Sequence, residues 1–565
     1  MAIINMLNKR AIRILNKYKK NNMNNDEKTN SNSMKTDIKI DEKIETKLRL
    51  KLPQEHISHK SAEENILEEL RNVNENYPLI TSKLNNKNVI LASAHIYFDD
   101  KNQTLKYDVI EPNLNEYMHE IINRTIEELH ENLDLEFENL KDKNEIQNYL
   151  NSKIDEIWKK MNLQPSQENS LILKYYTVRQ VSGLEIIDAI MQDPNIEDIS
   201  CDGIGMPIFI FHRNPIYGEM ATNLLFNTKQ DLDSFCMRLA QKAKRSISVA
   251  NPLMDGSLED GSRVQITYGT DISRRGSNFT IRKFFKNPLS PIDLMKFETV
   301  DAITLAYLWY AIEMEKSILI AGSTASGKTT FLNSISLFIR PNDKIVSIED
   351  TSELQIPRTN WIPQVTRTGF GPDKYGEIDM HNLLKSSLRQ RPDYLIVGEV
   401  RGVEAEVLFQ AMATGHPGLS TIHADNVYAV IDRLSTPPIQ LPLSVLQNLD
   451  IIVFLEKMKK EGKFFRKLKK VVEVEGFDSK NKELKINDAI IYDPKTNGFT
   501  KNESFILSNI AETNAKNHEN ILDEIMRRSN ILKWMYDKEI TRFEEVNKII
   551  TTYYVNPEAV LNMIK

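Results

Sequence analysis

The spacing of apolar positions changes along the chain, and each spacing predicts a different kind of element. From Val89 to Pro112, apolar and polar residues alternate on both sides of a polar turn at 99–102, and this pattern predicts a β-hairpin. Residues 115–162, rich in Glu, Lys, Asn and Ile, fit two solvent-exposed helices, and a third helix is expected at about 170–191. Nothing in these segments indicates a catalytic site.

A second group of alternating segments predicts a small α+β domain. Residues 196–213 have the pattern of two strands joined by a glycine turn, residues 229–244 that of a helix, and residues 263–268 and 278–283 those of two more strands. The Asn-Pro-Leu-Ser-Pro segment at 287–291 has the composition of an interdomain hinge, so a second domain is expected to begin there.

The first twenty residues place apolar side chains at helical spacing, and six basic and no acidic residues occur between positions 9 and 20. This pattern predicts a basic amphipathic helix, which either docks on an anionic membrane or a partner or is merely a solvated tail. Asn5, Asn8 and Lys9 interrupt any apolar run of the signal-peptide kind. The polar residues 21–45 are expected to be disordered.

The strongest motif is a strand, a glycine-bounded loop and a helix in direct succession. The apolar run 317–321 leads into the P-loop pattern Gly-Ser-Thr-Ala-Ser-Gly-Lys-Thr at 322–329, and a helical pattern follows to residue 340. The two glycines would let the backbone close around phosphates, the lysine would neutralise their oxygens, and the threonine would ligate Mg²⁺. The motif predicts nucleotide binding by Gly322, Ser323, Thr324, Ala325, Ser326, Gly327, Lys328, Thr329 and Thr330.

Acidic residues follow the next apolar strand of the chain. The run 344–348 leads into Glu349 and Asp350, with Glu353 close behind. At the carboxyl end of a parallel strand such groups reach bound ligands. A carboxylate there can orient or deprotonate the water that attacks a phosphate; alternatively, the three residues cap a loop and form surface ion pairs.

A further strand at 393–398 leads into Glu399, which is therefore the expected Walker B carboxylate that helps to hold the metal and to position water. Arg389, Arg391 and Arg401 flank this strand and are candidate sensor residues.

Two histidines bracket a short predicted strand, His416 before it and His423 after it. Because they follow two acidic strand ends, they suit a sensor that hydrogen-bonds the γ-phosphate or its water, and a purely structural role is the alternative. A metal site is disfavoured, since no cysteine is near and the spacing matches no zinc signature.

Composition and charge narrow the classes of protein. The 565 residues suggest about three domains, and 41% hydrophobic with 27% charged residues is typical of a folded chain. The net charge of −6 disfavours a dedicated DNA-binding protein. Two cysteines, Cys201 and Cys236, cannot supply a disulfide framework or a four-thiolate zinc site. The longest apolar runs are too short to predict a transmembrane helix.

Four motifs in order resemble the Walker A, Asp, Walker B and His boxes of the type II secretion and type IV pilus assembly ATPases: GSTASGKTT, IEDTSEL, RQRPDYLIVGEVRG and ATGHPGLSTIHAD. The resemblance covers about residues 180–460 and is greatest to the archaeal secretion, pilus and archaellum branch, through segments 197–203 and 260–284. Thr351 stands where the bacterial Asp box usually has proline. Many bacterial members carry a tetracysteine zinc insertion, which two cysteines cannot supply, so no zinc is expected.

The resemblance implies an α/β fold class: a RecA-like P-loop ATPase domain preceded by a PAS-like α+β domain, with a helical N-terminal extension and a small C-terminal α+β extension. The expected division is a basic helix and disordered tail at 1–45, an N-terminal extension at 46–165, the PAS-like domain at 166–287, the RecA-like domain at 288–460 and the C-terminal extension at 461–565.

The resemblance also implies roles for individual residues. Lys328 and Thr329 would bind ATP and Mg²⁺. Glu349 and Glu399 would act in hydrolysis, and His416 and His423 would sense the γ-phosphate. Arginines of the PAS-like domain would complete the site; the candidates are Arg263, Arg275 and Arg282, with Arg274 as a further one.

By the same resemblance the chain would be a homo-hexameric ATPase at the inner face of the cytoplasmic membrane, acting on a polytopic platform protein that feeds pilin-like subunits into a pilus-like filament or a type II-like secretion system. An archaellum assembly or rotation ATPase of the same family is an alternative. A RecA-like motor that translocates nucleic acid is an alternative of another class, which the acidic net charge disfavours, and no specific nucleic acid is expected to bind. A silent P-loop scaffold is disfavoured because Lys328, Thr329 and Glu399 are intact.

Overall fold

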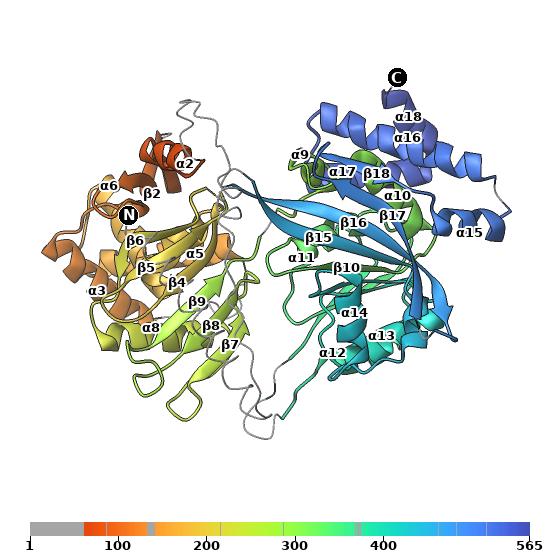
Figure 1. Cartoon of the computed structure of the whole chain (residues 1–565). Coiled ribbons are helices and arrows are strands. Elements are labelled where there is room, and N and C mark those ends of the chain that lie inside the picture. The colour runs from red at the N-terminus through yellow and green to blue at the C-terminus, as the bar shows by residue number, and fades with distance from the viewer. Residues whose placement is uncertain are drawn as a thin grey trace, which may run out of the picture. The chain divides into compact units, whose positions relative to one another are not determined.

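The computed structural model describes residues 62–564 apart from 86, 133–141, 215, 286, 368, 370–374, 461–462, 482 and 516. The basic helix expected within residues 1–20 and the disorder expected at 21–45 therefore lie outside the described residues. The described chain contains two nine-stranded sheets, one from its N-terminal half and one from its C-terminal half (Figure 1).

The first sheet joins strands that the sequence assigned to two different segments. In spatial order its strands are β1-β2-β3-β6-β5-β4-β9-β8-β7. β3 pairs with β6 in parallel, with Lys106 opposite Ala221, so one sheet continues across the boundary expected at residue 165. The strands are β1 (Asn74–Leu84), β2 (Lys87–Asp99), β3 (Thr104–Ile110), β4 (Ile196–Cys201), β5 (Pro207–His212), β6 (Glu219–Leu225), β7 (Leu253–Ser257), β8 (Arg263–Thr267) and β9 (Asn278–Arg282).

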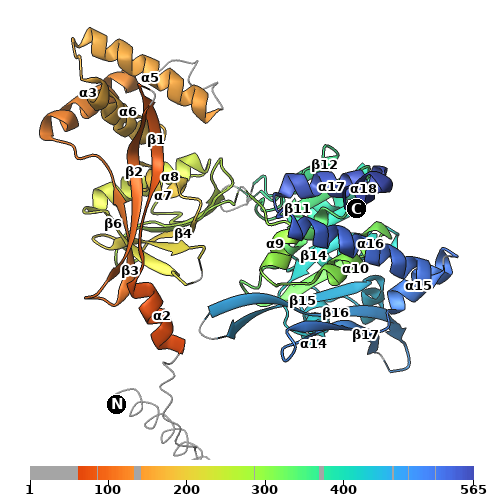
Figure 2. The same ribbon diagram turned by 90° about the horizontal axis from the view of Figure 1, so that it is seen from above.

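The helices α3, α5 and α6 lie at one end of the long strands β1 and β2 (Figure 2). They bury a core of their own, which includes Ile122, Leu150 and Trp158. The hairpin expected at 89–112 and the helices expected at 115–162 are confirmed. The helix expected at 170–191 is interrupted between Val181 and Glu185. The turn there requires glycine at 183, since a Cβ would lie 2.6 Å from the Arg179 carbonyl oxygen. The helices of this half are α2 (Ala62–Arg71), α3 (Glu116–Asn132), α5 (Lys143–Lys160), α6 (Gln167–Val181), η1 (Glu185–Ile187), α7 (Asp188–Gln192) and α8 (Lys229–Lys242).

The second sheet, in the order β12-β11-β13-β14-β10-β15-β16-β17-β18, combines a parallel and an antiparallel part. The first six strands in this order, from β12 through β10 to β15, pair in parallel, and β15, β16, β17 and β18 pair antiparallel. The sheet therefore continues past the boundary expected at residue 460. The strands are β10 (Ile318–Gly322), β11 (Ile345–Glu349), β12 (Trp361–Val365), β13 (Tyr394–Val397), β14 (Gly418–Ile422), β15 (Ile451–Lys460), β16 (Lys463–Asp478), β17 (Glu483–Asp493) and β18 (Gly498–Lys501).

Helices cover both faces of the second sheet, so its central strands are buried on both sides. Every residue of β10, β11, β13 and β14 is buried. Ile318 and Ile320 belong to one core, while Leu319 and Ala321 belong to another, as strand alternation requires. The helices are α9 (Pro291–Lys296), α10 (Ala302–Glu313), α11 (Lys328–Ser336), α12 (Met380–Ser387), η2 (Leu388–Gln390), α13 (Glu404–Ala413), α14 (Val427–Ser435), η3 (Leu443–Asn448), α15 (Phe505–Thr513), α16 (His518–Asp537), α17 (Phe543–Val555) and α18 (Pro557–Ile564).

The C-terminal helices pack against the P-loop half rather than forming a separate core. The Trp309 ring of α10 stacks on the Phe338 ring with 5.3 Å between the ring centroids, and Trp309 Nε1 donates to the Tyr554 hydroxyl of α17 at 2.9 Å. Arg528 of α16 is buried and forms ion pairs with Glu313 of α10 and Glu524. Across the part of the chain that the structure describes, no helix is both long and apolar enough to cross a membrane.

A fully buried carboxylate joins β16 to the start of α15. Glu473 accepts hydrogen bonds from the Tyr307 hydroxyl at 2.6 Å and the Ser504 hydroxyl at 2.5 Å. It also accepts from the Phe505 backbone N–H at 2.8 Å and the Asn487 side chain at 3.0 Å. With this number of donors the buried charge is fully solvated by the protein.

Replacing Glu473 by Ala is expected to destabilise the protein by about 3 kcal/mol, because four donors, among them the buried Tyr307 and Ser504 hydroxyls, lose their acceptor at once. Thermal unfolding measures the effect as a fall of several degrees in Tm. Glu475→Ala, two residues along the same strand and exposed, is the matched control and should leave Tm almost unchanged. Equal Tm values for the two variants would contradict the structural role of this network.

Candidate nucleotide-binding site

The P-loop connects the central strand β10 to the amino end of α11. A Cβ at Gly322 would lie 2.5 Å from the Leu455 carbonyl oxygen, so the close approach of β10 and β15 requires glycine. Gly327 has φ +90° and Ala325 has φ +60°, so the loop turns twice through the left-handed region. The first N–H groups of α11 have no partner within the helix, and the amino end of a helix with such free donors favours anions.

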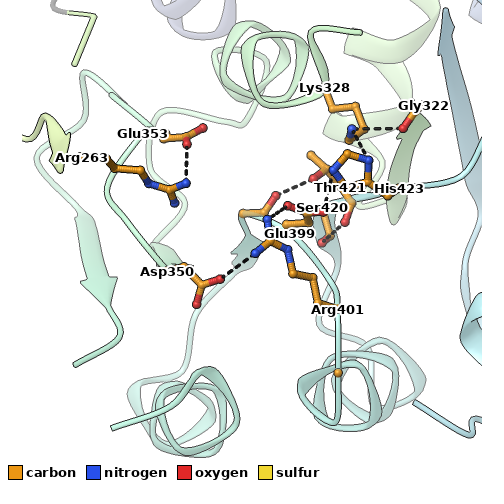
Figure 3. Close-up of polar contacts among 12 residues, drawn as sticks. Arg263, Gly322, Lys328, Asp350, Glu353, Glu399, Arg401, Ser420, Thr421 and His423 are labelled. Carbon is orange, nitrogen blue, oxygen red and sulfur yellow. Dashed lines mark hydrogen bonds and ion pairs between the residues drawn. The ribbon is translucent and has the colours of Figure 1, made fainter. Parts of the chain in front are cut away.

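Lys328 is buried inside the loop. Its Nζ donates to the carbonyl oxygens of Gly322 at 3.1 Å and Ser323 at 3.0 Å, and lies 3.3 Å from His423 Nδ1 (Figure 3). Burial lowers the pKa of Lys328, and the nearby Arg401 lowers it further, while Glu399 opposes the shift. The lysine is therefore a partly desolvated cation in the position where a P-loop receives phosphate.

His423 follows the end of β14 and lies between the lysine and the Walker B carboxylate. Burial and the Lys328 charge lower the pKa of His423, so the imidazole is neutral at neutral pH. An ammonium group can only donate, so Nδ1 accepts from Lys328 and the ring proton is on Nε2. Nε2 lies 3.2 Å from Glu399 Oε1, which is an electrostatic contact although its angles are not those of a hydrogen bond.

The backbone on each side of Glu399 is fixed by neighbouring strands. The Gly398 N–H donates to the Ile348 carbonyl at 2.9 Å, and the Val400 N–H donates to the Thr421 carbonyl at 2.9 Å. The Thr421 hydroxyl donates to the Gly398 carbonyl at 2.7 Å. These bonds from two flanking strands hold the Walker B carboxylate on a rigid support.

The Glu399 side chain is oriented by an arginine. Arg401 Nη2 donates to Glu399 Oε2 at 2.5 Å, and its Nη1 lies 3.6 Å from Asp350. The hydrogen bond to Glu399 raises the pKa of Arg401, so the guanidinium keeps its charge. Four residues singled out from the sequence therefore lie together with Lys328: Asp350, Glu399, Arg401 and His423 (Figure 3).

Glu349 has a different environment from Glu399. Its Oε1 accepts the backbone N–H groups of Glu353 and Leu354 at 3.0 and 3.1 Å, while its Oε2 is buried with no hydrogen-bond partner among the described residues. Burial raises the pKa of Glu349 to about 7. A Cβ at Gly398 would lie 3.1 Å from Glu349 Cγ, so the glycine gives this carboxylate its space beside the Walker B strand.

Other predicted residues lie away from this cluster. His416 precedes β14, at the opposite end of the strand from His423, and lines a cavity with Arg391 and Asp393. Its Nδ1 is 3.3 Å from the Thr414 hydroxyl. Arg389 belongs to η2, before β13, and so lies on the amino side of the sheet as well.

The arginine candidates of the first sheet have separate partners. Arg263 and Arg282 are paired across β8 and β9. Arg263 Nη1 lies 3.7 Å from Glu353 Oε1, and Arg282 Nε donates to Asp198 at 3.1 Å, a bond that raises the pKa of Arg282. Arg275 lies in the β8–β9 connection, where its carbonyl accepts the Ile204 N–H at 2.9 Å. Of these, Arg263 contacts a residue of the Asp box.

Three residues near the site were not singled out from the sequence. Thr421 supports Glu399, as described above. Arg433 Nη1 donates to the His423 carbonyl at 3.2 Å, and Arg466 Nε donates to the Ala325 carbonyl at 3.1 Å. A hydroxyl inside the His box could have drawn attention to Thr421. Arg433 lies 10 residues after the backbone atom that it contacts and Arg466 lies 141 residues after its own, and neither belongs to a motif, so no sequence signal marks them.

The polar groups fit Mg²⁺ and a phosphate chain together rather than a metal ion alone. Among the described residues, no three His, Cys, Asp or Glu side chains are grouped so that they could hold a metal ion. Glu399 Oε1 and the Ser326 hydroxyl are buried without a hydrogen-bond partner among the described residues, and Thr329 is the second residue of α11, which begins at Lys328. Such a set suits an ion that takes most of its oxygens from phosphate and water.

The chain is similar to proteins of secretion systems. The family described as "Type II/IV secretion system protein" matches residues 223–473, and one described as "PilB3-like, C-terminal" matches residues 495–565. "Uncharacterized protein MJ0900" of Methanocaldococcus jannaschii is 38% identical over 400 residues, 70% of this chain and 71% of that protein. "Type IV secretion system protein PtlH" of Bordetella pertussis is 32% identical over 268 residues, 42% of this chain and 79% of that protein. The solved structure of the pilus retraction motor PilT with ADP is 18% identical, with a TM-score of 0.37, and covers 66% of this chain and 93% of that one.

The buried Glu349 carboxyl generates a prediction for the pH dependence of stability. Its pKa is about 7 in the folded chain against an ordinary value of 4.5, so between these pH values the folded chain holds a proton that the unfolded chain has released. This carboxyl therefore lowers the free energy of unfolding progressively as pH rises through that window. Glutamine keeps the Oε1 acceptor and does not ionise. The Tm of Glu349→Gln, relative to wild type, is expected to rise between pH 5 and pH 8 in calorimetry.

Glu406→Gln, exposed on α13 and not among the groups that shift the pKa of Glu349, is the control and should show no such rise. A difference in Tm between Glu349→Gln and wild type that stays constant from pH 5 to pH 8 would rule out the raised pKa.

Proposed function

We propose, from the premise that the chain belongs to the type II/IV secretion system protein family, that it is an ATP-hydrolysing motor of a secretion or pilus-assembly machine. The observation that carries this proposal is the approach of Lys328, His423 and Glu399 to one another at the mouth of the P-loop. Each comes from the end of a different buried parallel strand or from the loop that follows one.

The proposed binding step uses the loop and its lysine. The N–H groups at the start of α11 and the Lys328 ammonium bind the phosphates of ATP, because both present positive charge in a site that is partly closed to water. Mg²⁺, when bound with ATP, neutralises phosphate charge. Thr329 and Glu399 are the residues that would hold it, Glu399 directly or through water.

The proposed hydrolytic step divides the work between two carboxylates. Glu399, oriented by Arg401, positions the attacking water beside the γ-phosphate. Glu349, whose pKa is about 7, can accept a proton from that water at neutral pH. His423 is neutral, accepts a hydrogen bond from Lys328 through Nδ1 and lies beside Glu399 through Nε2. The imidazole can therefore transmit the binding of phosphate at Lys328 to Glu399.

The proposed motor is a homo-hexamer, as the resemblance of the four boxes implies. Arg263 is the candidate that transmits the state of the site to the first sheet, since it forms an ion pair with Glu353 of the Asp box. We propose that the work is done on a polytopic membrane platform protein, at the inner surface of the cytoplasmic membrane, and through it on pilin-like subunits.

The central test is steady-state ATP hydrolysis by the full chain. Lys328→Ala and Glu399→Gln are each expected to reduce kcat by at least about a hundredfold, because they remove phosphate neutralisation and water positioning respectively. Glu406→Gln, on the exposed face of α13, is the control for the second variant and should keep wild-type turnover. Retention of wild-type turnover by Lys328→Ala would exclude the proposed activity.

Two additions to the assay separate the membrane motor from a nucleic-acid motor. Vesicles with acidic phospholipid are expected to raise turnover, and single-stranded DNA to leave it unchanged. Strong stimulation by DNA with no response to vesicles would instead identify a translocase.

Oligomer formation is expected to depend on bound nucleotide. Glu399→Gln should bind ATP without consuming it, so light scattering behind a sizing column should give about six times the chain mass with ATP and a smaller mass without it. A single-chain mass with saturating ATP would contradict the hexamer.

A further inference from the structure

The β15–β16 hairpin contacts the P-loop through one arginine. Arg466 lies on β16, opposite Lys457 of β15, and its Nε donates to the Ala325 carbonyl at 3.1 Å. Its Cδ would lie 3.2 Å from a Cβ placed on Gly327, so the arginine side chain also packs over the second turn of the loop. None of the four family boxes includes this residue.

The atom that Arg466 contacts belongs to the most unusual residue of the loop. Ala325 has φ +60°, a conformation that residues other than glycine adopt at an energetic cost. A cationic donor on its carbonyl favours this conformation over alternatives in which the carbonyl points elsewhere. The turn at Ala325 in turn sets the direction of the N–H groups that follow it.

Lys328 does not depend on this contact. Its Nζ is held by the carbonyl oxygens of Gly322 and Ser323 and by His423. Gly322 and His423 lie outside the Ala325 turn, which the hydrogen bond from the Ser326 N–H to the Ser323 carbonyl closes at 3.3 Å. Loss of Arg466 should therefore disturb the backbone cradle for phosphates more than the lysine that follows it.

The hairpin adds positive charge on the same side. Residues paired across an antiparallel hairpin share a face, and alternate pairs share it too. Lys457 pairs with Arg466, and two positions further along β15 Lys459 pairs with Phe464, so the two pairs lie on the same face. The Lys457 and Lys459 ammonium groups lie 4.3 and 5.7 Å from the centre of the Phe464 ring. Arg466 is thus the member of a cationic face that reaches the loop.

We propose that Arg466 is a positioning residue for the phosphate-binding loop, which sets nucleotide affinity by holding the Ala325 turn. The inference rests on the proposed binding of ATP at this loop. It also connects the loop to the C-terminal helices, because the strand that carries Arg466 continues to Glu473, which binds the start of α15.

The test measures ADP affinity, and KM and kcat for ATP, with the full chain. Arg466→Ala is expected to raise the Kd for ADP and the KM for ATP about tenfold, the value of one charge-assisted hydrogen bond, while kcat changes less than about threefold. Arg466→Lys keeps the charge but not the planar Nε donor, so it should recover only part of the affinity. Lys469→Ala removes a charge from the same strand, where Lys469 pairs with Glu456, and should behave as wild type.

A double-mutant cycle with Ala325→Gly separates positioning from direct contact with phosphate. Glycine adopts positive φ readily, so in this background the loss of Arg466 should weaken ADP binding less than it does with alanine at 325. Equal losses in both backgrounds, or an unchanged Kd for ADP in Arg466→Ala, would overturn the inference. A failure of the proposed function would be seen separately, as wild-type turnover in Lys328→Ala.

Discussion

The site depends on the parallel pairing of β11, β13, β14 and β10. Parallel strands end at the same edge of a sheet, so residues separated by as many as 95 positions, such as Lys328 and His423, come within hydrogen-bond distance. The strands are buried on both faces and cannot shift register without exposing their apolar side chains. The chemistry at the edge is therefore as rigid as the core beneath it.

Burial also gives the two glutamates different properties. Glu399 accepts a hydrogen bond from Arg401 on one oxygen, while its other oxygen lies 3.2 Å from His423 Nε2. Glu349 receives only backbone N–H groups on one oxygen, and burial of the other raises the pKa of this carboxyl to about 7. One carboxylate thus lies beside a cation, while the other can exchange a proton near neutral pH.

The succession of strands and helices along the P-loop half of the chain could be predicted, because apolar runs, glycine spacing and acidic strand ends are local signals. The union of β1 to β3 with β4 to β9 could not, since it rests on a parallel pairing of Lys106 with Ala221 across more than a hundred residues. The sequence analysis likewise treated His416 and His423 as a pair. The five-residue strand β14 separates them, so His416 lies at the amino ends of the parallel strands and His423 at their carboxyl ends. Motif spacing indicates which residues matter but not the end of the strand at which each one lies.

The C-terminal strands extend this reasoning beyond the motifs. β16 contributes Arg466 to the P-loop at one point and Glu473 to the C-terminal helices at another. A strand transmits displacement along its length because its covalent backbone is already close to full extension. A change in the Ala325 turn would therefore alter the position of the strand on which α15 is anchored. α16 packs in the same core as α10, so the C-terminal helices belong to the same packed domain as the nucleotide site. The region that carries no family box is thus physically continuous with the region that carries all four.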